Sequence, residues 1–267
     1  MRFTAKFVED PSKPKEKGTI RLMCASDTHG HHGDIPQSQI FPSDFFLFAG
    51  DFTIFGNPND AESFKKWIQS LPCTYKVIIP GNLDLTFDTA NLSHLKEKII
   101  KGCNLDDTNT LIQLESVKEN FISNFDKSNI YYIENKKIEI SGLKIFGSPH
   151  TAEFMNFAFQ FPGNTGKDKY KKLLVDGKND DIDILITHWP PKGVCDKTKS
   201  GENWGDEELK AIIGKIQPCL HIFGHIHEAH GYSYINKTLC CNVAVVNEKR
   251  AVVNPPTYID LIPIDKK

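Results

Sequence analysis

The chain has 267 residues, of which 39% are hydrophobic and 25% are charged, as expected of a globular protein. Its formal net charge of -2 argues against binding to long nucleic acid or to a membrane surface through bulk charge. We expect neither a secretory signal nor a membrane span, because no apolar run approaches the roughly 18 residues that a span requires. Seven cysteines without a Cys-x-x-Cys pair indicate reduced thiols and a cytoplasmic protein.

Apolar runs rich in β-branched and aromatic residues predict the strands. We expect them at 19–26, 44–49, 75–80, 130–134, 137–147 (a hairpin), 183–187, 219–223, 239–246 and 257–263. Residues 8–18 are polar and indicate a lead-in segment or a surface loop.

Three other stretches repeat apolar residues at helical spacing. They are Ala61–Leu71, capped by Asn59 or Asp60, then Leu111–Phe125, and finally Asp206–Ile216. Strands and helices alternate in the first half of the chain, which predicts βαβ units. The second half is richer in strands, which predicts a second sheet stacked on the first. No domain boundary is visible, so we treat residues 1–267 as one domain.

Five short motifs follow predicted strands, and each carries an oxygen or imidazole that can bind a metal ion. They are Asp27-Thr28-His29, Gly50-Asp51, Gly81-Asn82, Thr187-His188 and Gly224-His225-Ile226-His227. Ligands of open α/β sheets bind beyond the carboxyl ends of the strands, so we expect these motifs to converge. Mixed carboxylate and imidazole ligands favour Mn²⁺, Fe, Zn²⁺ or Co²⁺ over Mg²⁺ or Ca²⁺. The set is large enough for two ions, with Asp51 as a carboxylate that can bridge them.

This ordered set of motifs resembles the calcineurin-like metallophosphoesterase family over residues 20–228. Other segments, such as Asn82–Asp88 and Thr187–Pro191, resemble the animal metallophosphoesterase-domain-containing subgroup and extend the likeness over nearly the whole chain. The resemblance implies a four-layer α/β/β/α sandwich with two stacked mixed β-sheets. It also implies two ligand sets that share the bridging Asp51. The first ion would be held by Asp27, His29, Asp51 and His227, and the second by Asp51, Asn82, His188 and His225.

The chain departs from the family pattern at one position. The family usually has a histidine after Gly-Asn, often assigned as the general acid, whereas this chain has Leu83. General acid catalysis typically contributes about 10²–10⁴-fold, so substrates with poor leaving groups should suffer most. Other members of the family lack this histidine and remain hydrolases. A loop histidine could take its place, and spacing does not choose among His31, His32, His150 and His230.

Several other features have an ordinary structural interpretation that we prefer. His221 lies in an apolar strand and is expected to be a hydrogen-bonded core residue, and His94 is expected at the surface. The period-two aromatic residues of 154–161 predict a half-buried strand, with Phe154 exposed near the site rather than packed. Lys192 and the segment 197–199 are expected to form a solvated charge cluster. The polar, helical region 97–126 is expected to be a cap over the site or a surface helix.

These features predict a cytoplasmic, dinuclear phosphoesterase that hydrolyses phosphodiester bonds, including those of cyclic nucleotides, with a metal-activated hydroxide. Two divalent transition metal ions are expected, Mn²⁺ first among them, and the partner is a small phosphoester. The predicted catalytic residues are Asp51, Asn82, His188 and His225, and the predicted substrate contacts are Asn82 and Phe154. The alternatives are an inactive scaffold with the same fold and a nuclease, which the charge balance disfavours for long polymers. No residue indicates an oligomer interface.

Overall fold

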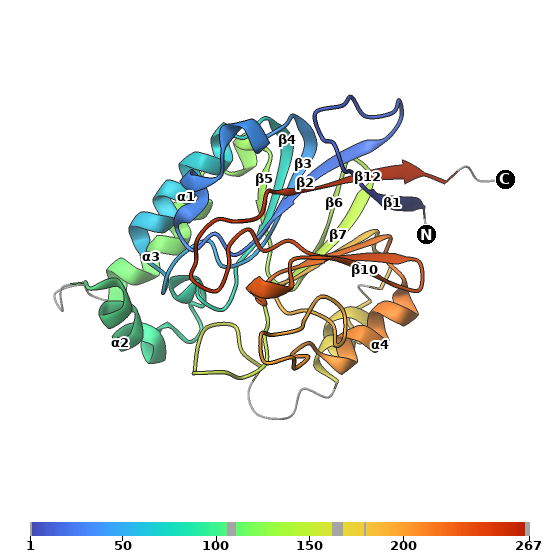
Figure 1. Cartoon of the computed structure of the whole chain (residues 1–267). Coiled ribbons are helices and arrows are strands. Elements are labelled where there is room, and N and C mark those ends of the chain that lie inside the picture. Colours follow the sequence, from blue (N-terminus) through green and yellow to red (C-terminus); the bar gives the residue numbers. More distant parts are fainter. Residues whose placement is uncertain (1, 106–110, 162–167, 179, 265–267) are drawn as a thin grey trace.

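Two six-stranded sheets lie face to face in the computed structural model, which describes residues 2–105, 111–161, 168–178 and 180–264 (Figure 1). The first sheet has the order β1 (Phe3–Phe7), β12 (Thr257–Pro263), β2 (Ile20–Ala25), β3 (Ser43–Ala49), β4 (Cys73–Ile79), β5 (Ile130–Tyr132). Strands β2 to β5 run parallel, whereas β12 is antiparallel to both β2 and β1. The sheet is therefore mixed, with its parallel part formed by the βαβ units that the sequence predicts.

The second sheet is mixed as well. Its order is β10 (Gly231–Ile235), β11 (Thr238–Asn242), β9 (Leu220–Phe223), β8 (Ile184–Thr187), β7 (Leu143–Ser148), β6 (Lys136–Ile140). The four central strands are parallel and the two edge strands are antiparallel. The central strands are buried on both faces, which explains why their sequences are continuously apolar.

Helices cover the outer face of each sheet (Figure 1). The first sheet carries α1 (Pro58–Ser70), α2 (Leu92–Cys103) and α3 (Leu111–Ile122), and the second carries α4 (Glu207–Ile216). Short helical turns occur at His31–Asp34, Gln37–Gln39, Leu85–Phe87, Asp126–Ser128, Lys171–Asp176 and His227–Ala229. No helix in the described ranges is both long and apolar enough to cross a membrane.

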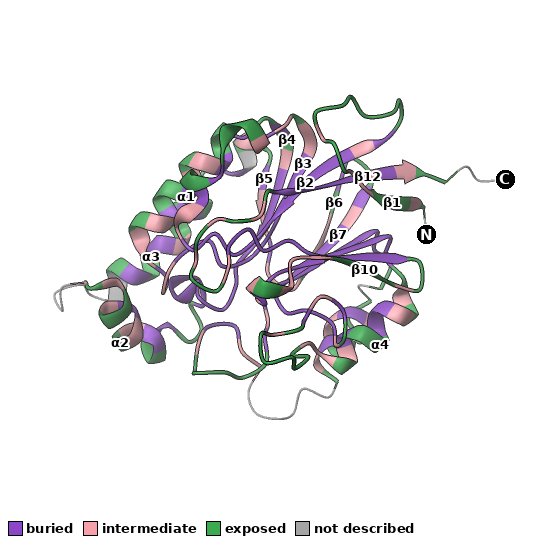
Figure 2. Cartoon of the chain, in the orientation of Figure 1, coloured by how far each residue is buried: buried purple, intermediate pink, exposed green. Residues whose placement is uncertain are grey.

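Three apolar cores hold these four layers together. The central core lies between the sheets and joins side chains such as Leu47 and Ile222 from opposite sheets. A second core lies beneath α1 and α3, where the ring of Phe52 stacks on Phe64 at 4.8 Å and on Phe121 at 5.0 Å. The third core lies beneath α4. Burial is accordingly concentrated in the strands and on the inner faces of the helices (Figure 2). The expected four-layer α/β/β/α sandwich is confirmed.

Most predicted elements are present, but two edge strands and one helix were not expected. Strands β1 and β10 are short, and α2 begins before the region that the sequence marked as helical. The strand expected at 239–246 ends at Asn242, after which the chain makes only isolated bridges to Ser26 and Val252. The cap of α1 is Asn57, whose side chain accepts from the amide of Asn59 at 2.9 Å, with Pro58 as the first helical residue.

The prediction of a strand within 154–161 is wrong. Met155, Asn156 and Phe159 have φ of 53°, 50° and 51°, so the backbone repeatedly enters the left-handed region and cannot extend. The segment is a loop that makes one bridge, between Thr151 and Gln160. Its Phe159 is buried, as the core interpretation expected, and Phe154 is exposed.

The region 97–126 is divided between two helices, and residues 106–110 lie outside the described part. Helix α3 packs on α1 and on the turn at Leu85–Phe87, with Leu114 and Phe121 in the core beneath it. This helix belongs to the outer layer and is not a cap over the site. Helix α2 lies farther along the same layer, and its Lys98 contacts the loop at Asn156.

Candidate dinuclear metal site

Five parallel strands from the two sheets end at one edge of the sandwich. Side chains with metal-ligating atoms follow each of these strand ends. Asp27 and His29 follow β2, Asp51 follows β3, Asn82 follows β4, His188 follows β8, and His225 and His227 follow β9. The structure brings all seven of these predicted residues together, although they are up to 200 positions apart in the sequence. The parallel direction of the strands is the reason, because it places their carboxyl ends on the same edge.

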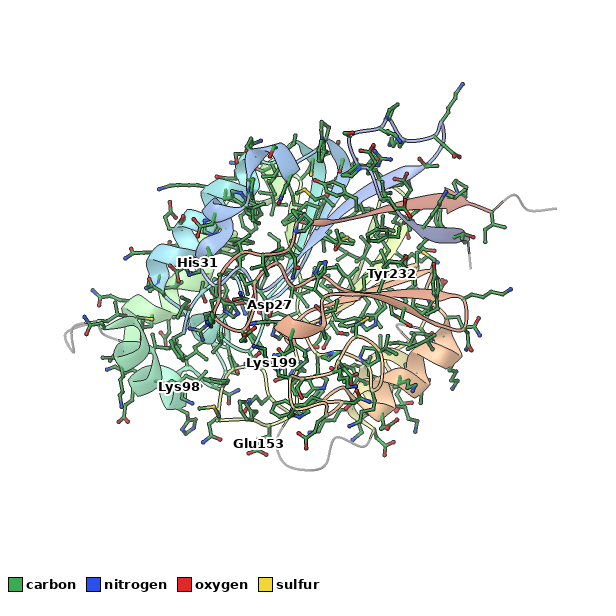
Figure 3. The ribbon with its side chains drawn as sticks, in the orientation of Figure 1. Asp27, His31, Lys98, Glu153, Lys199 and Tyr232 are labelled. Atoms are coloured by element: carbon green, nitrogen blue, oxygen red, sulfur yellow. The ribbon has the colours of Figure 1, made fainter. Side chains whose placement is uncertain are left out.

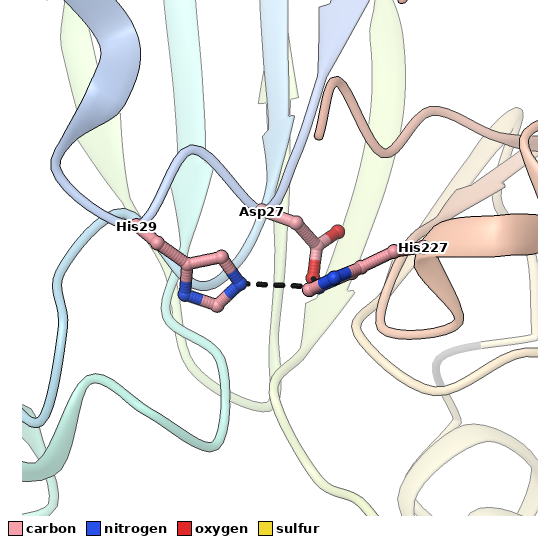
Figure 4. Close-up of side chains that lie close together, drawn as sticks. All are labelled: Asp27, His29 and His227. Atoms are coloured by element: carbon pink, nitrogen blue, oxygen red, sulfur yellow. Dashed lines mark hydrogen bonds and ion pairs between the residues drawn. The ribbon is translucent and has the colours of Figure 1, made fainter. Parts of the chain in front are cut away.

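The first cluster comprises Asp27, His29 and His227 (Figure 4). The two histidine rings approach from opposite sides of the Asp27 carboxylate, and their Nε2 atoms are 3.1 Å apart. Nε2 of His227 is 3.4 Å from Oδ1 of Asp27. The carboxylate is fully buried and also accepts from the backbone amide of His225 at 3.1 Å. Three ligand atoms, two on buried residues and one on the half-buried His227, thus lie within 4.8 Å of one another.

The second cluster comprises Asp51, Asn82, His188 and His225. The amide oxygen of Asn82 is 2.9 Å from Nε2 of His188 and 2.9 Å from Nδ1 of His225. The two ring nitrogens are 3.3 Å from each other. Oxygen and nitrogen atoms with lone pairs therefore converge here as they do in the first cluster.

The Asp51 carboxylate lies between the two clusters. Its Oδ2 is 3.9 Å from Nε2 of His29 in the first cluster and 3.4 Å from Nε2 of His188 in the second. Its Oδ1 accepts from the backbone amide of Leu83 at 2.7 Å. One oxygen is held by the protein and the other faces both clusters, which is the arrangement that a bridging carboxylate needs.

The protonation of the rings fits divalent ions. Nδ1 of His188 donates to the carbonyl of Ala49 at 2.8 Å, and Nδ1 of His227 donates to the carbonyl of Asn247 at 3.2 Å. These bonds orient each ring so that its Nε2 points into the cluster, where it can ligate a metal ion once its proton has been displaced. Burial lowers the pKa of His29 to about 4, so this ring is neutral near pH 7. Neutral imidazoles and ionised carboxylates are the forms that bind metals.

The charge of His188 supports the same interpretation. Burial alone would lower its pKa, but the Asp51 carboxylate outweighs burial and raises the pKa to about 9. Without a metal, a proton thus supplies the positive charge that the buried carboxylates require. A divalent ion can take the place of that proton.

The backbone at the site is strained, which is a frequent property of functional sites. Asp27, His29, Asp51 and His225 have φ of 58°, 43°, 61° and 69°, all in the left-handed region. Gly224 allows the close approach of the strand ends, because a Cβ there would lie 2.0 Å from Oδ2 of Asp27. The glycines of the sequence motifs therefore have a steric role beside the ligands.

Comparison with known proteins identifies this arrangement. The family model described as calcineurin-like phosphoesterase matches residues 20–229, which include every motif above. The chain belongs to the calcineurin-like phosphoesterase family.

Known relatives of this phosphoesterase cover most of its length. Human metallophosphoesterase domain-containing protein 1 is 33% identical over 93% of the chain and 73% of its own length. The UPF0046 protein T07D4.2 of Caenorhabditis elegans is 35% identical over 95% of the chain and 62% of its own length. Among solved structures, the phosphopantetheinyl hydrolase PptH of Mycobacterium tuberculosis is similar in fold, with a TM-score of 0.56 at 13% identity. That match covers 86% of the chain and 90% of PptH.

Sequence reasoning missed one residue of the phosphoesterase site. Asp84 is fully buried, and its carboxylate accepts from the backbone amides of Gly81 at 2.7 Å and Asp51 at 3.0 Å. It also accepts from the amide of Thr53 at 2.9 Å and its hydroxyl at 2.7 Å. Asp84 thereby ties the loop after β3 to the loop after β4. The signal in the sequence was a lone Asp in an apolar segment, which also fits an ordinary turn.

The four candidate substitutes for the missing histidine have other contacts. His32 bonds to Ser63 at 2.9 Å, and Nδ1 of His230 donates to a backbone carbonyl at 2.9 Å. His31 is 3.0 Å from Asp34, and the ring of His150 stacks on an aromatic neighbour at 4.6 Å. Among the described residues, none of the four joins either cluster.

The remaining sequence interpretations agree with the structure. His221 is buried and bonded to Thr187 at 2.8 Å, and His94 is exposed. Lys199 forms an exposed ion pair with Glu248. Phe154 is exposed, and its loop reaches the site, where the amide of Ala158 donates to the carbonyl of Asn82 at 3.1 Å.

Proposed function

We propose that the protein is a dinuclear, metal-dependent phosphodiesterase. The observation that carries this proposal is Oδ2 of Asp51, which faces His29 on one side and His188 on the other. Asp27, His29, Asp51 and His227 would hold the first ion, and Asp51, Asn82, His188 and His225 the second. Mn²⁺ is our first choice, with Fe, Zn²⁺ or Co²⁺ as the other metals that suit these ligands.

The chain's own residues would position the reaction. Two ions bound here would activate water and neutralise charge on the phosphoryl group. Asn82 and His188 would fix the geometry of the second position, because both are buried and held by bonds of 2.8–2.9 Å. Asp84 would keep the backbone of Asp51 in place. The exposed ring of Phe154 would contact the leaving group from the loop next to Asn82.

We propose phosphodiesters, including cyclic nucleotides, rather than phosphomonoesters as substrates. Leu83 cannot donate a proton, and no histidine proposed as its substitute joins the clusters in the described part of the chain. An activated or strained diester depends less on a general acid than an alkyl monoester does. The retention of all seven predicted ligands argues against the inactive scaffold.

We also propose that the chain works as one metallophosphoesterase domain in the cytoplasm. A single core shared by the two sheets supports one domain. The seven cysteines are free thiols, which supports a reducing compartment.

The decisive experiment is hydrolysis of bis-p-nitrophenyl phosphate by metal-stripped protein with and without Mn²⁺. Activity that requires Mn²⁺ and is lost in Asp51→Asn would support the proposal. Asp34→Asn is the matched control, because it removes an exposed carboxylate outside the site and should leave activity unchanged. If protein that binds two ions hydrolyses no ester with Mn²⁺, Co²⁺, Ni²⁺ or Zn²⁺, the scaffold becomes the better hypothesis.

A further inference from the structure

A turn beside the metal site presents an arginine. The side chain of Asn247 accepts from the amides of Lys249 at 2.9 Å and Ala251 at 3.1 Å. Its backbone carbonyl accepts from the amide of Arg250 at 2.8 Å and from Nδ1 of His227 at 3.2 Å. The same residue thus shapes the turn and orients a predicted metal ligand, so the turn is fixed relative to the site.

Arg250 is unusual among the arginines of this chain. Arg2 pairs with Asp183, and Arg21 is 2.9 Å from Asp260. Within the described ranges, no carboxylate pairs with Arg250. Its side chain is half-buried and its φ is 60°, a left-handed conformation that costs energy for a residue other than glycine. A half-buried guanidinium that is held in a strained turn without a counter-ion is a candidate for anion binding.

An aromatic ring beneath Arg250 determines where the guanidinium lies. The guanidinium carbon is 5.8 Å from the centre of the Phe55 ring. Phe55 belongs to the loop that follows Asp51, and its own φ is 53°. Its ring also packs closely against α2, where a Cβ on Gly102 would lie 2.6 Å from the ring. The contact therefore holds the guanidinium beside the loop that carries the bridging carboxylate.

Both neighbours of the guanidinium lead back to the site. Asn247, in the same turn, accepts from Nδ1 of His227, and Phe55 lies in the loop that follows Asp51.

The surrounding side chains form a rim at the same edge of the sandwich. Phe157 lies 6.2 Å from Phe55 and 6.4 Å from Phe154, which in turn lies 5.8 Å from Trp204. These four aromatic residues come from the loops after β3, β7 and β8, which also carry or adjoin predicted ligands. They form the apolar side of the rim.

The rest of the rim is charged. The backbone of Lys199 donates to Glu228 at 3.0 Å, and its ammonium group pairs with Glu248, which lies in the same turn as Arg250. In Figure 3, Asp27 lies near the middle of the molecule, between Lys98 on one side and Tyr232 on the other. The ion pairs among the described residues do not involve Arg250, so its guanidinium is available for a ligand at this rim.

We propose that Arg250 binds a non-bridging oxygen of the substrate's phosphoryl group. A guanidinium donates charge-assisted hydrogen bonds to phosphoryl oxygens, and it stays protonated at every physiological pH. It therefore supplies charge and orientation but no proton, so it does not replace the general acid that is lost at Leu83. This inference rests on the proposed function of the site.

The test compares Arg250→Ala and Arg250→Lys with Lys249→Ala, which removes an exposed cation from the same turn. We expect Arg250→Ala to raise the KM for bis-p-nitrophenyl phosphate and the dissociation constant of inorganic phosphate by about 10- to 100-fold, the loss typical of a charged hydrogen bond. Arg250→Lys should recover part of this loss, and Lys249→Ala should stay within about twofold of the wild type. Binding of Mn²⁺, followed by calorimetry, should be the same in all variants.

Three results would overturn the assignment of Arg250. They are equal effects of Arg250→Ala and Lys249→Ala, a loss of Mn²⁺ binding in Arg250→Ala, and a Mn²⁺-loaded wild type that binds no phosphate. The phosphate measurement separates this inference from the proposed function. If the wild type hydrolyses no diester but binds phosphate through Arg250, the proposed activity is refuted and the proposed anion-binding role of Arg250 is retained.

Discussion

Replacing Asp84 by asparagine should destabilise the protein although it hardly changes the volume of the side chain. Each oxygen of the carboxylate accepts two bonds, one pair from Gly81 and Asp51 and the other from the amide and hydroxyl of Thr53. An amide has only one oxygen, so its NH₂ group would face one of these pairs. If the NH₂ group faces Thr53, the Thr53 hydroxyl can rotate to accept from it. The backbone N–H of Thr53 is then buried without an acceptor.

The expected loss follows from this count of bonds. One unsatisfied buried N–H costs about 1–3 kcal/mol, and the bonds that remain lose the added strength of a charged acceptor. We therefore expect the free energy of unfolding to fall by about 2–4 kcal/mol. Burial, together with the Asp51 charge, raises the pKa of Asp84 to about 7, so the comparison belongs at pH 8, where the carboxylate is ionised.

Urea unfolding of metal-free protein, followed by circular dichroism, measures this loss. Asp34→Asn is the control, because its exposed carboxylate is paired only with His31 among the described residues. The amide that Asp84→Asn introduces would also loosen the backbone of Asp51, so Mn²⁺ binding should weaken together with stability. A variant within about 0.5 kcal/mol of the wild type would refute the role that we assign to these four bonds.

Four further predictions concern the metal site itself. Asp51 raises the pKa of His188 in the folded protein to about 9, whereas in the unfolded chain it is about 6.5. The stability that protonated His188 contributes should therefore be complete below pH 6.5 and be lost as the pH rises through 9. Thermal unfolding of metal-free protein at several pH values measures this loss. Mn²⁺ must displace that proton, so its affinity should rise by up to about tenfold per pH unit between 7 and 9, and calorimetry that finds no proton release would contradict this. Gly224→Ala should abolish Mn²⁺ binding by the first cluster, because its Cβ would lie 2.0 Å from Oδ2 of Asp27, and normal binding stoichiometry would contradict the steric argument. Leu83→His should raise turnover of esters with poor leaving groups much more than that of nitrophenyl esters, and equal gains on both would exclude the general-acid explanation.

Local patterns in the sequence were sufficient for most of the fold. The buried parallel strands are continuous apolar runs, and helix α4 has both an amphipathic stripe and a capping Asp206. Strand β1 was missed because its five residues gain their partner only from β12, about 250 residues later in the chain. The aromatic segment near Phe157 was misread because period-two spacing does not reveal residues with positive φ.

The candidate site divides in the same way. The predicted ligands could be named from the sequence because each motif follows its own strand, and strand ends are where α/β sheets place ligands. The roles of Asp84 and Arg250 could not be predicted, since neither residue type is distinctive at its position. Asp84 acquires its role from loops about 30 residues away, and Arg250 from a ring nearly 200 residues away.

The sequence by itself therefore determined most of the strands, the layered fold and the chemical nature of the metal ligands, because these depend on local composition and on the order of motifs. Tertiary structure alone decided that one oxygen of Asp51 faces both clusters and that the candidate histidine substitutes are occupied elsewhere. It also decided that Arg250 lacks a carboxylate partner in the described part of the chain. Such properties are distances between atoms of remote segments, and they exist only once the two sheets have packed together.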